Sequence, residues 1–406
     1  MSYKPIKPRI ASVSEQNAPK FVIGRDQCVK SLWEDLESSS LRLLAERRMG
    51  KTWIIRLALA KKPDWAVPLF FDAEKINSSP QFVWLLNKSM YENKAIEEDR
   101  LEFIKKWYDV ARRLVQQLQG QSVGKIEIPQ IDPWDSLLED TFKHLVKRSG
   151  EKRPVLIIDE LPLYLDKLIK SNNSDDAIQL LDTLRAIRQE FNDVRMVFCG
   201  SLGLHVILDK LRRNGYTGSP YNNMPSFEVH PLAPEKAQYL AGCLLLGADI
   251  ECTKLDDVAT AIAEAGCGVP FYIQHMVMWM QKKKELTWNP EKALSIPDEW
   301  FQNYEDPANL AYFNKRLDSY YSEDQADKAR SLLNVLSKKS EGMPLDELIN
   351  LVRHHPKTKI IDKDQLGRVL DTLYKDHYII MQNGRWRFKL EIIRKWWWER
   401  RGKNGL

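Results

Sequence analysis

The sequence predicts an α/β protein with a parallel sheet, followed by an all-helical segment and a small C-terminal domain of helices and one hairpin. Short apolar runs alternate with helical patterns from about residue 21 to about residue 232, and the runs have the continuous hydrophobicity of strands buried on both faces. Near the C-terminus, an Asn383-Gly384 pair separates two alternating runs, which is the strongest short-range signal for a hairpin.

Five apolar runs in the first part of the chain are predicted as strands. They cover residues 41–45, 66–71, 155–159, 196–200 and 227–230. An insertion over about 91–150 separates the second strand from the third, with a small hairpin at 123–128 and a helix from Trp134 to about residue 147. Residues 1–20 are expected to form an extended arm, so the α/β core covers 21–232.

The remaining chain divides into three further segments. Residues 233–283 have helical periodicity only and are interpreted as a small helical lid, with breaks around Gly266 and Pro270. Residues 284–323 contain Pro290, Pro297 and Pro307 and are expected to form a linker that serves as a hinge. Residues 324–406 show the helix and hairpin pattern of a winged-helix domain.

The winged-helix interpretation rests on five elements in order. One helix is expected over 324–338, a second opens at Pro344, and a third begins at Asp362 or Asp364 and ends near residue 377. The hairpin strands follow at 378–382 and 385–389, and a final helix carries three consecutive tryptophans, of which at least one must be buried.

Composition sets outer limits on function. The 406 residues suffice for two or three domains, and 43% hydrophobic with 29% charged residues is ordinary for a globular chain. The net charge of +5 permits an acidic partner without requiring one. The five cysteines have no C-x-x-C spacing, and no apolar run approaches the ~18 residues of a membrane span. These features predict a cytoplasmic protein with reduced thiols and no membrane partner.

A phosphate-binding loop is predicted directly after the first strand. The loop reads Ala45, Glu46, Arg47, Arg48, Met49, Gly50, Lys51 and Thr52, and Trp53 continues as a helix. This matches the P-loop pattern G-x-x-x-x-G-K-[ST], except that Ala45 replaces the first glycine. Backbone N–H groups would cradle the phosphates of ATP, Lys51 would reach the β- and γ-phosphates, and Thr52 would ligate Mg²⁺. The alternative is a chance G-K-T at a strand–helix junction.

The third strand ends in two carboxylates, as the second motif of a nucleotide hydrolase does. Asp159 and Glu160 close an aliphatic run, and parallel strands end at the edge where ligands bind. Asp159 would hold Mg²⁺, and Glu160 would orient or deprotonate the attacking water. The alternative is that Asp159 only caps a helix. Ser201, at the end of the fourth strand, could sense the γ-phosphate or could belong to an ordinary turn.

Together these motifs resemble the archaeal-type ATPases, which belong with the STAND branch of AAA+-like P-loop NTPases. Three further segments add to the resemblance, and one of them, residues 386–398, is similar to the family's winged-helix end. Residues 21–25 are similar to the family's h-h-G-R box, so Gly24 and Arg25 would lie near the adenine. Residues 266–271 are similar to its G-x-P motif, which implies that Pro270 contacts the nucleotide. The implied fold is an ASCE-type P-loop sheet with a helical lid and a winged helix.

The resemblance implies a slow nucleotide switch, in which ATP or ADP state controls homo-oligomerisation or engagement of a partner protein in signalling or defence. A neighbouring subunit often supplies an arginine to such sites. The candidates, which could equally be surface residues, are Arg185, Arg188, Arg195, Arg212 and Arg213.

The alternative function is a DNA-binding ATPase of the transposition or replication-loader type that uses the winged helix. Eight basic residues interleave with aromatic ones between 385 and 403, and such a pattern suits phosphate contacts. A basic face does not identify its partner, however, and the same residues could pack against the core. His354 and His355 are expected at the surface and hold no metal.

Overall fold

A computed structural model describes residues 2–9, 14–44, 46, 48–95, 98–118, 133–200, 203–283, 287–303, 305–354 and 362–403 of the chain. These residues pack into two compact units. The sheet unit comprises residues 28–45 and 57–228, and the helix-rich unit comprises residues 1–27, 46–56 and 229–406. The chain therefore passes from one unit to the other at the loop after the first strand and again within the helix that follows it.

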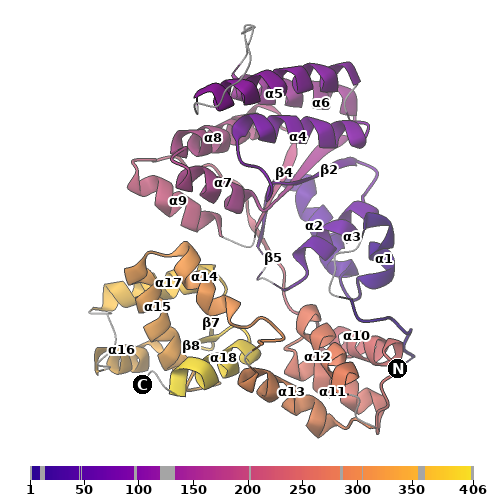
Figure 1. The fold of residues 1–406 in the computed structure, drawn as a ribbon, viewed down its shortest axis with the longest axis vertical. Helices are drawn as coiled ribbons and strands as arrows, with labels where there is room; N and C mark the ends of the chain where they lie inside the picture. Colours follow the sequence, from indigo (N-terminus) through magenta and orange to yellow (C-terminus); the bar gives the residue numbers. More distant parts are fainter. Residues whose placement is uncertain are drawn as a thin grey trace. The chain divides into compact units, whose positions relative to one another are not determined.

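The sheet unit is built on five parallel strands in the order β2-β3-β4-β1-β5 (Figure 1). The strands are β1 (Leu41–Leu44), β2 (Ala66–Asp72), β3 (Arg153–Asp159), β4 (Arg195–Gly200) and β5 (Ser226–Glu228). The prediction of a parallel sheet is confirmed, and each strand lies within two residues of its expected bounds. In β3, which has a strand on each side, residues 154–159 are all buried, which explains its uninterrupted apolar sequence.

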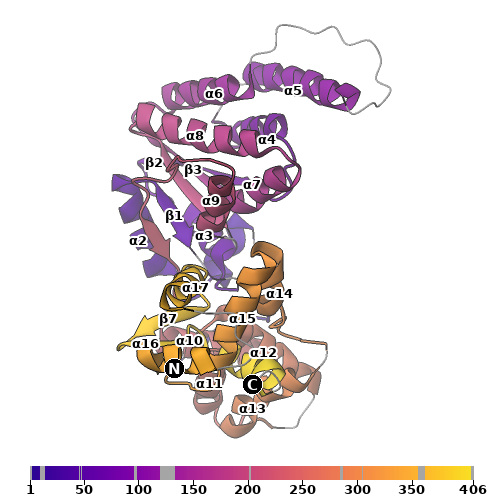
Figure 2. The same ribbon diagram turned by 90° about the vertical axis from the view of Figure 1, so that its left-hand side faces the viewer.

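Helices cover the sheet in layers. They are α2 (Asp26–Ser38), α3 (Lys51–Ala60), α4 (Ser79–Glu92), α5 (Glu98–Leu118), α6 (Trp134–Ser149), α7 (Leu161–Lys170), α8 (Ser174–Glu190) and α9 (Leu204–Arg213). The insertion helices α5 and α6 both pack against α4 and form the outermost layer of this unit (Figure 2). The hairpin predicted at 123–128 lies outside the described residues.

The helix-rich unit contains a cluster of four helices, here called the α10–α13 cluster. The helices are α10 (Pro234–Gly247), α11 (Leu255–Ala265), α12 (Pro270–Lys283) and α13 (Pro290–Gln302). Three of them fall within the segment predicted as a helical lid. The fourth lies in the predicted linker and packs mainly on α11.

The segment 284–323, which was predicted as a linker, contains helical structure among its described residues. Pro290 is the first residue of α13, where its missing N–H would have had no partner, and the side chain of Asn289 caps that end by accepting from the N–H of Lys292 at 2.9 Å. A further helix, α14 (Tyr312–Tyr320), follows after Pro307. Pro290 thus begins a helix, Pro297 occupies an interior position of the same helix, and Pro307 lies in a turn before α14.

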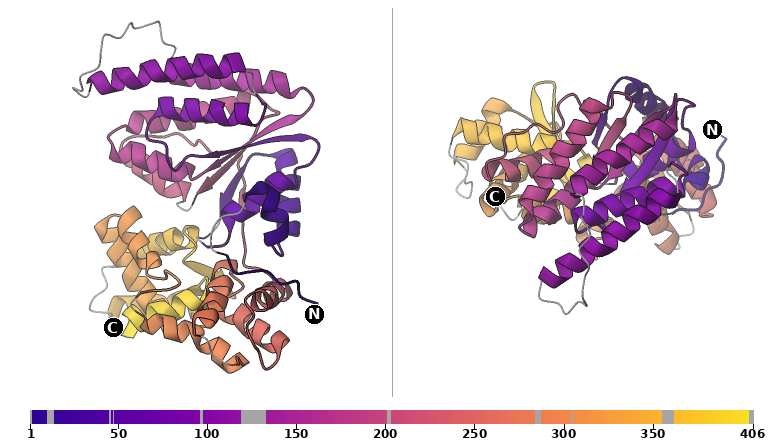
Figure 3. Two further views of the ribbon diagram at one scale, coloured as in Figure 1. Left: turned by 45° about the vertical axis from the view of Figure 1, so that its right-hand side comes forward. Right: turned by 90° about the horizontal axis from the view of Figure 1, so that it is seen from above.

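The N-terminal arm lies along the α10–α13 cluster in an extended conformation (Figure 3). The N–H of Ile6 donates to the carbonyl of Cys243 at 2.9 Å, and the Tyr3 hydroxyl donates to Asp256. Two glycines of α10 make room for it. A Cβ on Gly242 would lie 2.3 Å from the ring of Tyr3, and one on Gly247 would lie 2.2 Å from the backbone of Ile6. The chain beyond the arm forms the short helices Glu15–Asn17 and Ala18–Phe21.

The C-terminal part of this unit contains helices and a three-stranded antiparallel sheet in the order β6-β8-β7. Its elements after α14 are α15 (Glu323–Leu336), β6 (Met343–Pro344), α16 (Leu345–His354), α17 (Lys363–Lys375), β7 (Ile379–Gln382), β8 (Arg385–Phe388), α18 (Glu391–Trp397) and a π-helical turn (Trp398–Gly402). Asn383 and Gly384 have φ angles of 50° and 73°, as the predicted two-residue turn requires.

A buried ion pair joins two helices of this C-terminal part. Arg316 of α14 and Asp376, directly after α17, lie 3.2 Å apart with side chains that are 5% and 2% exposed. Asp376 also accepts a hydrogen bond from the Tyr321 hydroxyl. Two of the three consecutive tryptophans, Trp396 and Trp397, are buried, in accord with the expectation that they cannot all face solvent. Among the described residues, no helix is both long and apolar enough to cross a bilayer.

Candidate functional site

The carboxyl ends of β1, β4 and β3 meet at one edge of the sheet. Leu43 of β1 pairs with Cys199 of β4, and Ile158 of β3 pairs with Phe198 of β4. Asp159, the last residue of β3, therefore lies close to the last residues of β4 and β1. Asp159 is 5% exposed, and its Oδ1 accepts a hydrogen bond from the N–H of Glu160 at 3.0 Å. The predicted acidic pair therefore closes a central strand at the edge where parallel sheets bind ligands.

Glu160 has an unusual backbone conformation. Its φ and ψ angles are 54° and 28°, in the left-handed region that residues with a side chain adopt at a cost of order 1 kcal/mol. It occupies the N-cap position of α7, but its side chain makes no capping hydrogen bond. Capping by this side chain thus does not account for the acid at this position.

A third carboxylate at this edge was missed by the sequence analysis. Asp72 is the last residue of β2 and is paired in register with Asp159. It is exposed, and its Oδ1 accepts from the N–H of Glu74 at 2.9 Å. The prediction ended this strand at Phe71 because the apolar run stops there. A strand that ends in an acid beside another acid-ending strand is the signal that could have identified Asp72.

The predicted phosphate-binding loop has a tight turn followed by a helix start. The N–H of Met49 donates to the carbonyl of Glu46 at 3.2 Å, and the N–H of Ile54 donates to the carbonyl of Gly50 at 2.9 Å. Gly50 has a φ of 85°, so the glycine at this position is needed for the turn. Lys51 is the first residue of α3, a ten-residue helix, and Thr52 and Trp53 lie in its first turn.

The N-terminus of α3 is suited to bind an anion, because its first N–H groups have no partner within the helix and carry the positive end of the helix dipole. Ala45 and Arg47 lie outside the described residues, and so does Ser201. The effect of alanine at the first P-loop position and the sensor role of Ser201 therefore stay predictions.

Arg25 connects the loop to the chain that enters the α10–α13 cluster. The residue is 6% exposed, and its guanidinium donates to the carbonyl of Met49 at 3.0 Å and to the carbonyl of His230 at 2.6 Å. The neighbouring Gly24 has no room for a side chain, since a Cβ there would lie 2.8 Å from Cβ of Lys236. Of the predicted G-R box, Arg25 thus contacts the phosphate-binding loop, and Gly24 lies against Lys236 of α10.

Arg48 of the loop contacts the start of α12. Its guanidinium lies 3.9 Å from the ring centroid of Phe271, and this ring lies 4.0 Å from that of His275. Arg48 has a φ of 82°, which an arginine rarely adopts. Pro270, the predicted nucleotide-contacting proline, is the first residue of α12 and directly precedes Phe271. The predicted G-x-P motif and the loop therefore meet.

The environment of Glu46 could not be foreseen from the sequence. Its side chain is 3% exposed, and its Oε2 has no hydrogen-bond partner among the described residues. Burial raises the pKa of Glu46 to about 8, even though the positive charges of Lys389 and Arg316 act to lower it. Both cations belong to the C-terminal part, so a P-loop carboxyl senses charges more than 250 positions away in the sequence.

The arginines considered as candidates for a neighbouring site have different surroundings. Arg195 begins β4, at the amino edge of the sheet, and donates to the carbonyls of Leu36 and Glu37 at 2.9 and 3.0 Å. Arg212 lies 3.5 Å from Asp209 on the same helix, and Arg213 is exposed. Their role toward a second subunit stays a prediction.

Comparisons with known proteins support the fold. A scan against protein-family models finds no match, and neither does a search of curated proteins. Among solved structures, the chain is similar to a Walker-type ATPase of Pyrococcus abyssi, at 14% identity over 98% of this chain and 99% of that chain, with a TM-score of 0.58. It is also similar to the ORC2 protein of Aeropyrum pernix in ADPNP–ADP complexes, at 11% identity over 97% and 95% of the two chains, with a TM-score of 0.46.

The first of these likenesses runs through nearly the whole of both chains and shows the fold of a P-loop ATPase. The order of the five strands agrees with this fold, because the strand before the P-loop and the strand that ends in Asp159 are separated by β4 alone. The predicted α/β fold class with a P-loop is thereby confirmed.

Proposed function

We propose that the chain binds ATP with Mg²⁺, hydrolyses it slowly, and couples its nucleotide state to homo-oligomerisation or to engagement of a partner protein. One observation carries this proposal: residues 46–56 pack in the same compact unit as the α10–α13 cluster and the C-terminal part. Arg25, Arg48 and Glu46 make this packing specific. A ligand that moves the loop must then also move or strain these contacts, which is the requirement for a switch.

The residue types fit the proposed ligands. Lys51, at the N-terminus of α3, would hold the β- and γ-phosphates. The Thr52 hydroxyl and the buried Asp159 carboxylate are hard oxygen donors of the kind that Mg²⁺ prefers. Mg²⁺ would neutralise charge on the phosphates, and Glu160 would orient or deprotonate the attacking water. Pro270 and Gly24 with Arg25 would border the adenine.

The helical lid and the winged helix are part of this proposal. Helices α15, α16 and α17 followed by the hairpin β7–β8 have the order expected of a winged helix. The α10–α13 cluster would act as the lid, since its helix α12 contacts the loop through Phe271. We place the protein in the cytoplasm, in accord with the five cysteines, none of which is joined to another by a disulfide in the described structure.

The alternative of a DNA-binding ATPase receives less support, because much of the C-terminal basic charge is used within the unit. Arg394 pairs with Glu391 at 2.6 Å and donates to the carbonyl of Ser337 at 2.6 Å. Arg400 donates to the carbonyl of Asn303 at 2.9 Å. Helix α17, the element that would enter a groove of DNA, also exposes acidic residues at 364 and 371.

The experiment that tests the switch measures the mass of the native protein in the absence of nucleotide, with ADP and with ATP. We expect the distribution of oligomers, or the set of co-purified proteins, to differ between the ATP and ADP states. Lys51→Ala provides the matched control and should give the nucleotide-free distribution under all three conditions. Identical distributions for wild type in all three conditions, with nucleotide binding demonstrated by calorimetry, would contradict the switch.

A further inference from the structure

A basic cavity lies at the amino edge of the sheet, opposite the edge that ends in Asp159. Its volume is about 280 Å³, and its lining contains Arg185, Arg188 and Arg195 together with four side-chain amides and three serines. Val194 is the remaining lining residue, so no carboxylate faces this cavity. Three guanidinium groups without an acid in the lining create a strongly positive and polar surface.

Two of these arginines have a side-chain N–H donor without a hydrogen-bond acceptor among the described residues. The Nε atoms of both Arg185 and Arg188 are buried and have no hydrogen-bond partner in the described parts of the chain. Arg188 also donates to the carbonyl of Pro220. Burial and the nearby charge of Arg185 lower the pKa of Arg188 to about 10. Two neighbouring guanidinium charges with N–H donors that lack acceptors destabilise the folded protein unless an anion binds to both.

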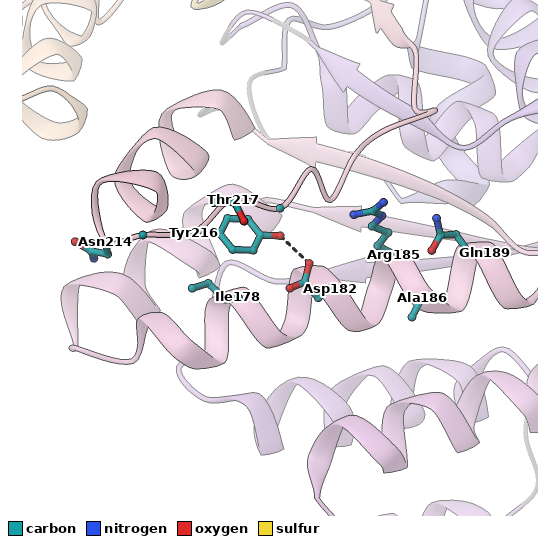
Figure 4. A pocket seen from close by; sticks show the side chains of 10 residues that line it. Ile178, Asp182, Arg185, Ala186, Gln189, Asn214, Tyr216 and Thr217 are labelled. Atoms are coloured by element: carbon teal, nitrogen blue, oxygen red, sulfur yellow. Dashed lines mark hydrogen bonds between the residues drawn. The ribbon is translucent and has the colours of Figure 1, made fainter.

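A second hollow, of about 660 Å³, adjoins this cavity and shares Arg185 and Gln189 with it. It lies between α8 and the loop after α9 (Figure 4). The loop presents Tyr216, whose hydroxyl donates to Asp182 at 2.7 Å. Figure 4 shows Asp182, Arg185 and Gln189 along one face of α8 toward this loop. The hollow has the size of a small-molecule site and offers an aromatic ring and polar groups.

We propose that this double cavity is a second ligand site, distinct from the P-loop, that binds the phosphate group of a small molecule. Guanidinium groups bind phosphate through paired N–H donors, and the two unsatisfied Nε atoms supply such donors. The phosphate lies between Arg185 and Arg188, and the rest of an esterified ligand extends toward Tyr216. Asp182 in the adjoining hollow disfavours a polyanion such as nucleic acid along the same path.

The test measures binding of inorganic phosphate, ribose 5-phosphate and adenosine 5′-monophosphate by calorimetry at constant ionic strength. Three variants separate the two sites. We expect binding of at least one of these probes to survive Lys51→Ala and to weaken at least tenfold in Arg185→Ala/Arg188→Ala. The double variant Arg212→Ala/Arg213→Ala removes the same charge from exposed positions on a neighbouring helix and should bind like wild type.

The relative affinities identify the source of the phosphate. Tighter binding of an ester than of inorganic phosphate indicates an organic ligand in the adjoining hollow, whereas equal affinity indicates free phosphate. Should the double variant fold poorly, Arg185→Gln keeps the test intact, because Arg185 contacts no backbone carbonyl through a described hydrogen bond. It should lose the ligand and unfold at the same temperature as wild type or higher, since a like-charge repulsion is removed.

Four binding results would overturn the proposal, and one stability result would do the same. The binding results are the absence of binding by all three probes, loss of binding only in Lys51→Ala, equal loss in the Arg212→Ala/Arg213→Ala control, and binding of single-stranded or duplex DNA through these arginines without binding of the small probes. A large fall in the unfolding temperature of Arg185→Gln would assign that arginine a structural role and would equally contradict the proposal.

Discussion

Replacement of Glu46 by glutamine should change how the stability of the protein depends on pH. The pKa of Glu46 is raised to about 8 from an ordinary 4.5, because burial disfavours the carboxylate. The folded state therefore binds this proton more tightly than the unfolded chain does. Its contribution to stability is fully present below pH 4.5 and is lost as the pH rises through 8.

The window from pH 6.5 to 8.5 isolates this effect. Burial and nearby positive charge lower the pKa of His275 from 6.5 to about 4, so its contribution has the opposite sign and is lost as the pH falls from 6.5 to 4. Below pH 6.5 the two contributions largely cancel. Between pH 6.5 and pH 8.5, deprotonation of Glu46 should lower the free energy of unfolding of wild type by about 2 kcal/mol. The loss is ~1.4 kcal/mol for each pH unit at pH values well below the pKa of Glu46.

Urea unfolding of wild type and Glu46→Gln, measured in parallel at several pH values, tests this reasoning. The difference between the two proteins should grow by about 2 kcal/mol across the window in favour of the glutamine variant. Glu34→Gln is the matched control, because Glu34 has a side chain that is 55% exposed in an exposed i,i+4 pair with Lys30. Parallel pH profiles for wild type and Glu46→Gln would show that Glu46 is ionised in the folded protein, and the argument from burial would fail.

Three further substitutions have defined outcomes. Lys51→Ala should abolish binding of a fluorescent ATP analogue, and binding at wild-type affinity would refute the P-loop prediction. Glu160→Gln should retain ATP binding and lose on the order of 100-fold or more in phosphate release, whereas unchanged release would remove Glu160 from the reaction. Asp376→Asn should lower the free energy of unfolding by about 3 kcal/mol, because it leaves the charge of buried Arg316 without its counter-ion; a loss below about 1 kcal/mol in urea unfolding would show that this pair is not structurally important.

The parts of the fold that depend on local sequence were predictable. The five strands are continuous apolar runs, and the hairpin turn at Asn383 and Gly384 requires only that two neighbouring residues adopt positive φ angles. The helix start at Lys51 was likewise predicted from neighbouring residues, namely the loop before it and the helical pattern after it. In each case the sequence within ten positions contains the physical cause.

Features that depend on contacts between distant segments were not predictable. The burial of Glu46 and the charges of Lys389 and Arg316 that act on it involve distant parts of the chain, and no periodicity connects these positions. Asp72 becomes part of the candidate site only through the register of β2 with β3. The prolines between 284 and 323 read as breaks because the cap at Asn289 and the packing of α13 on α11 were unknown.

The contact between the N-terminal arm and α10 has a consequence for recognising related chains. Gly242 lies inside α10, where glycine costs about 1 kcal/mol relative to alanine, and Gly247 is the last residue of that helix. At positions 242 and 247 the neighbours are Tyr3 and the backbone of Ile6. In a homologue without such an arm, these two positions should drift to alanine or larger residues. Small residues at both, five apart in the first helix after the sheet, would therefore mark members of the fold that keep the arm in place, even where the arm's own sequence has diverged beyond alignment.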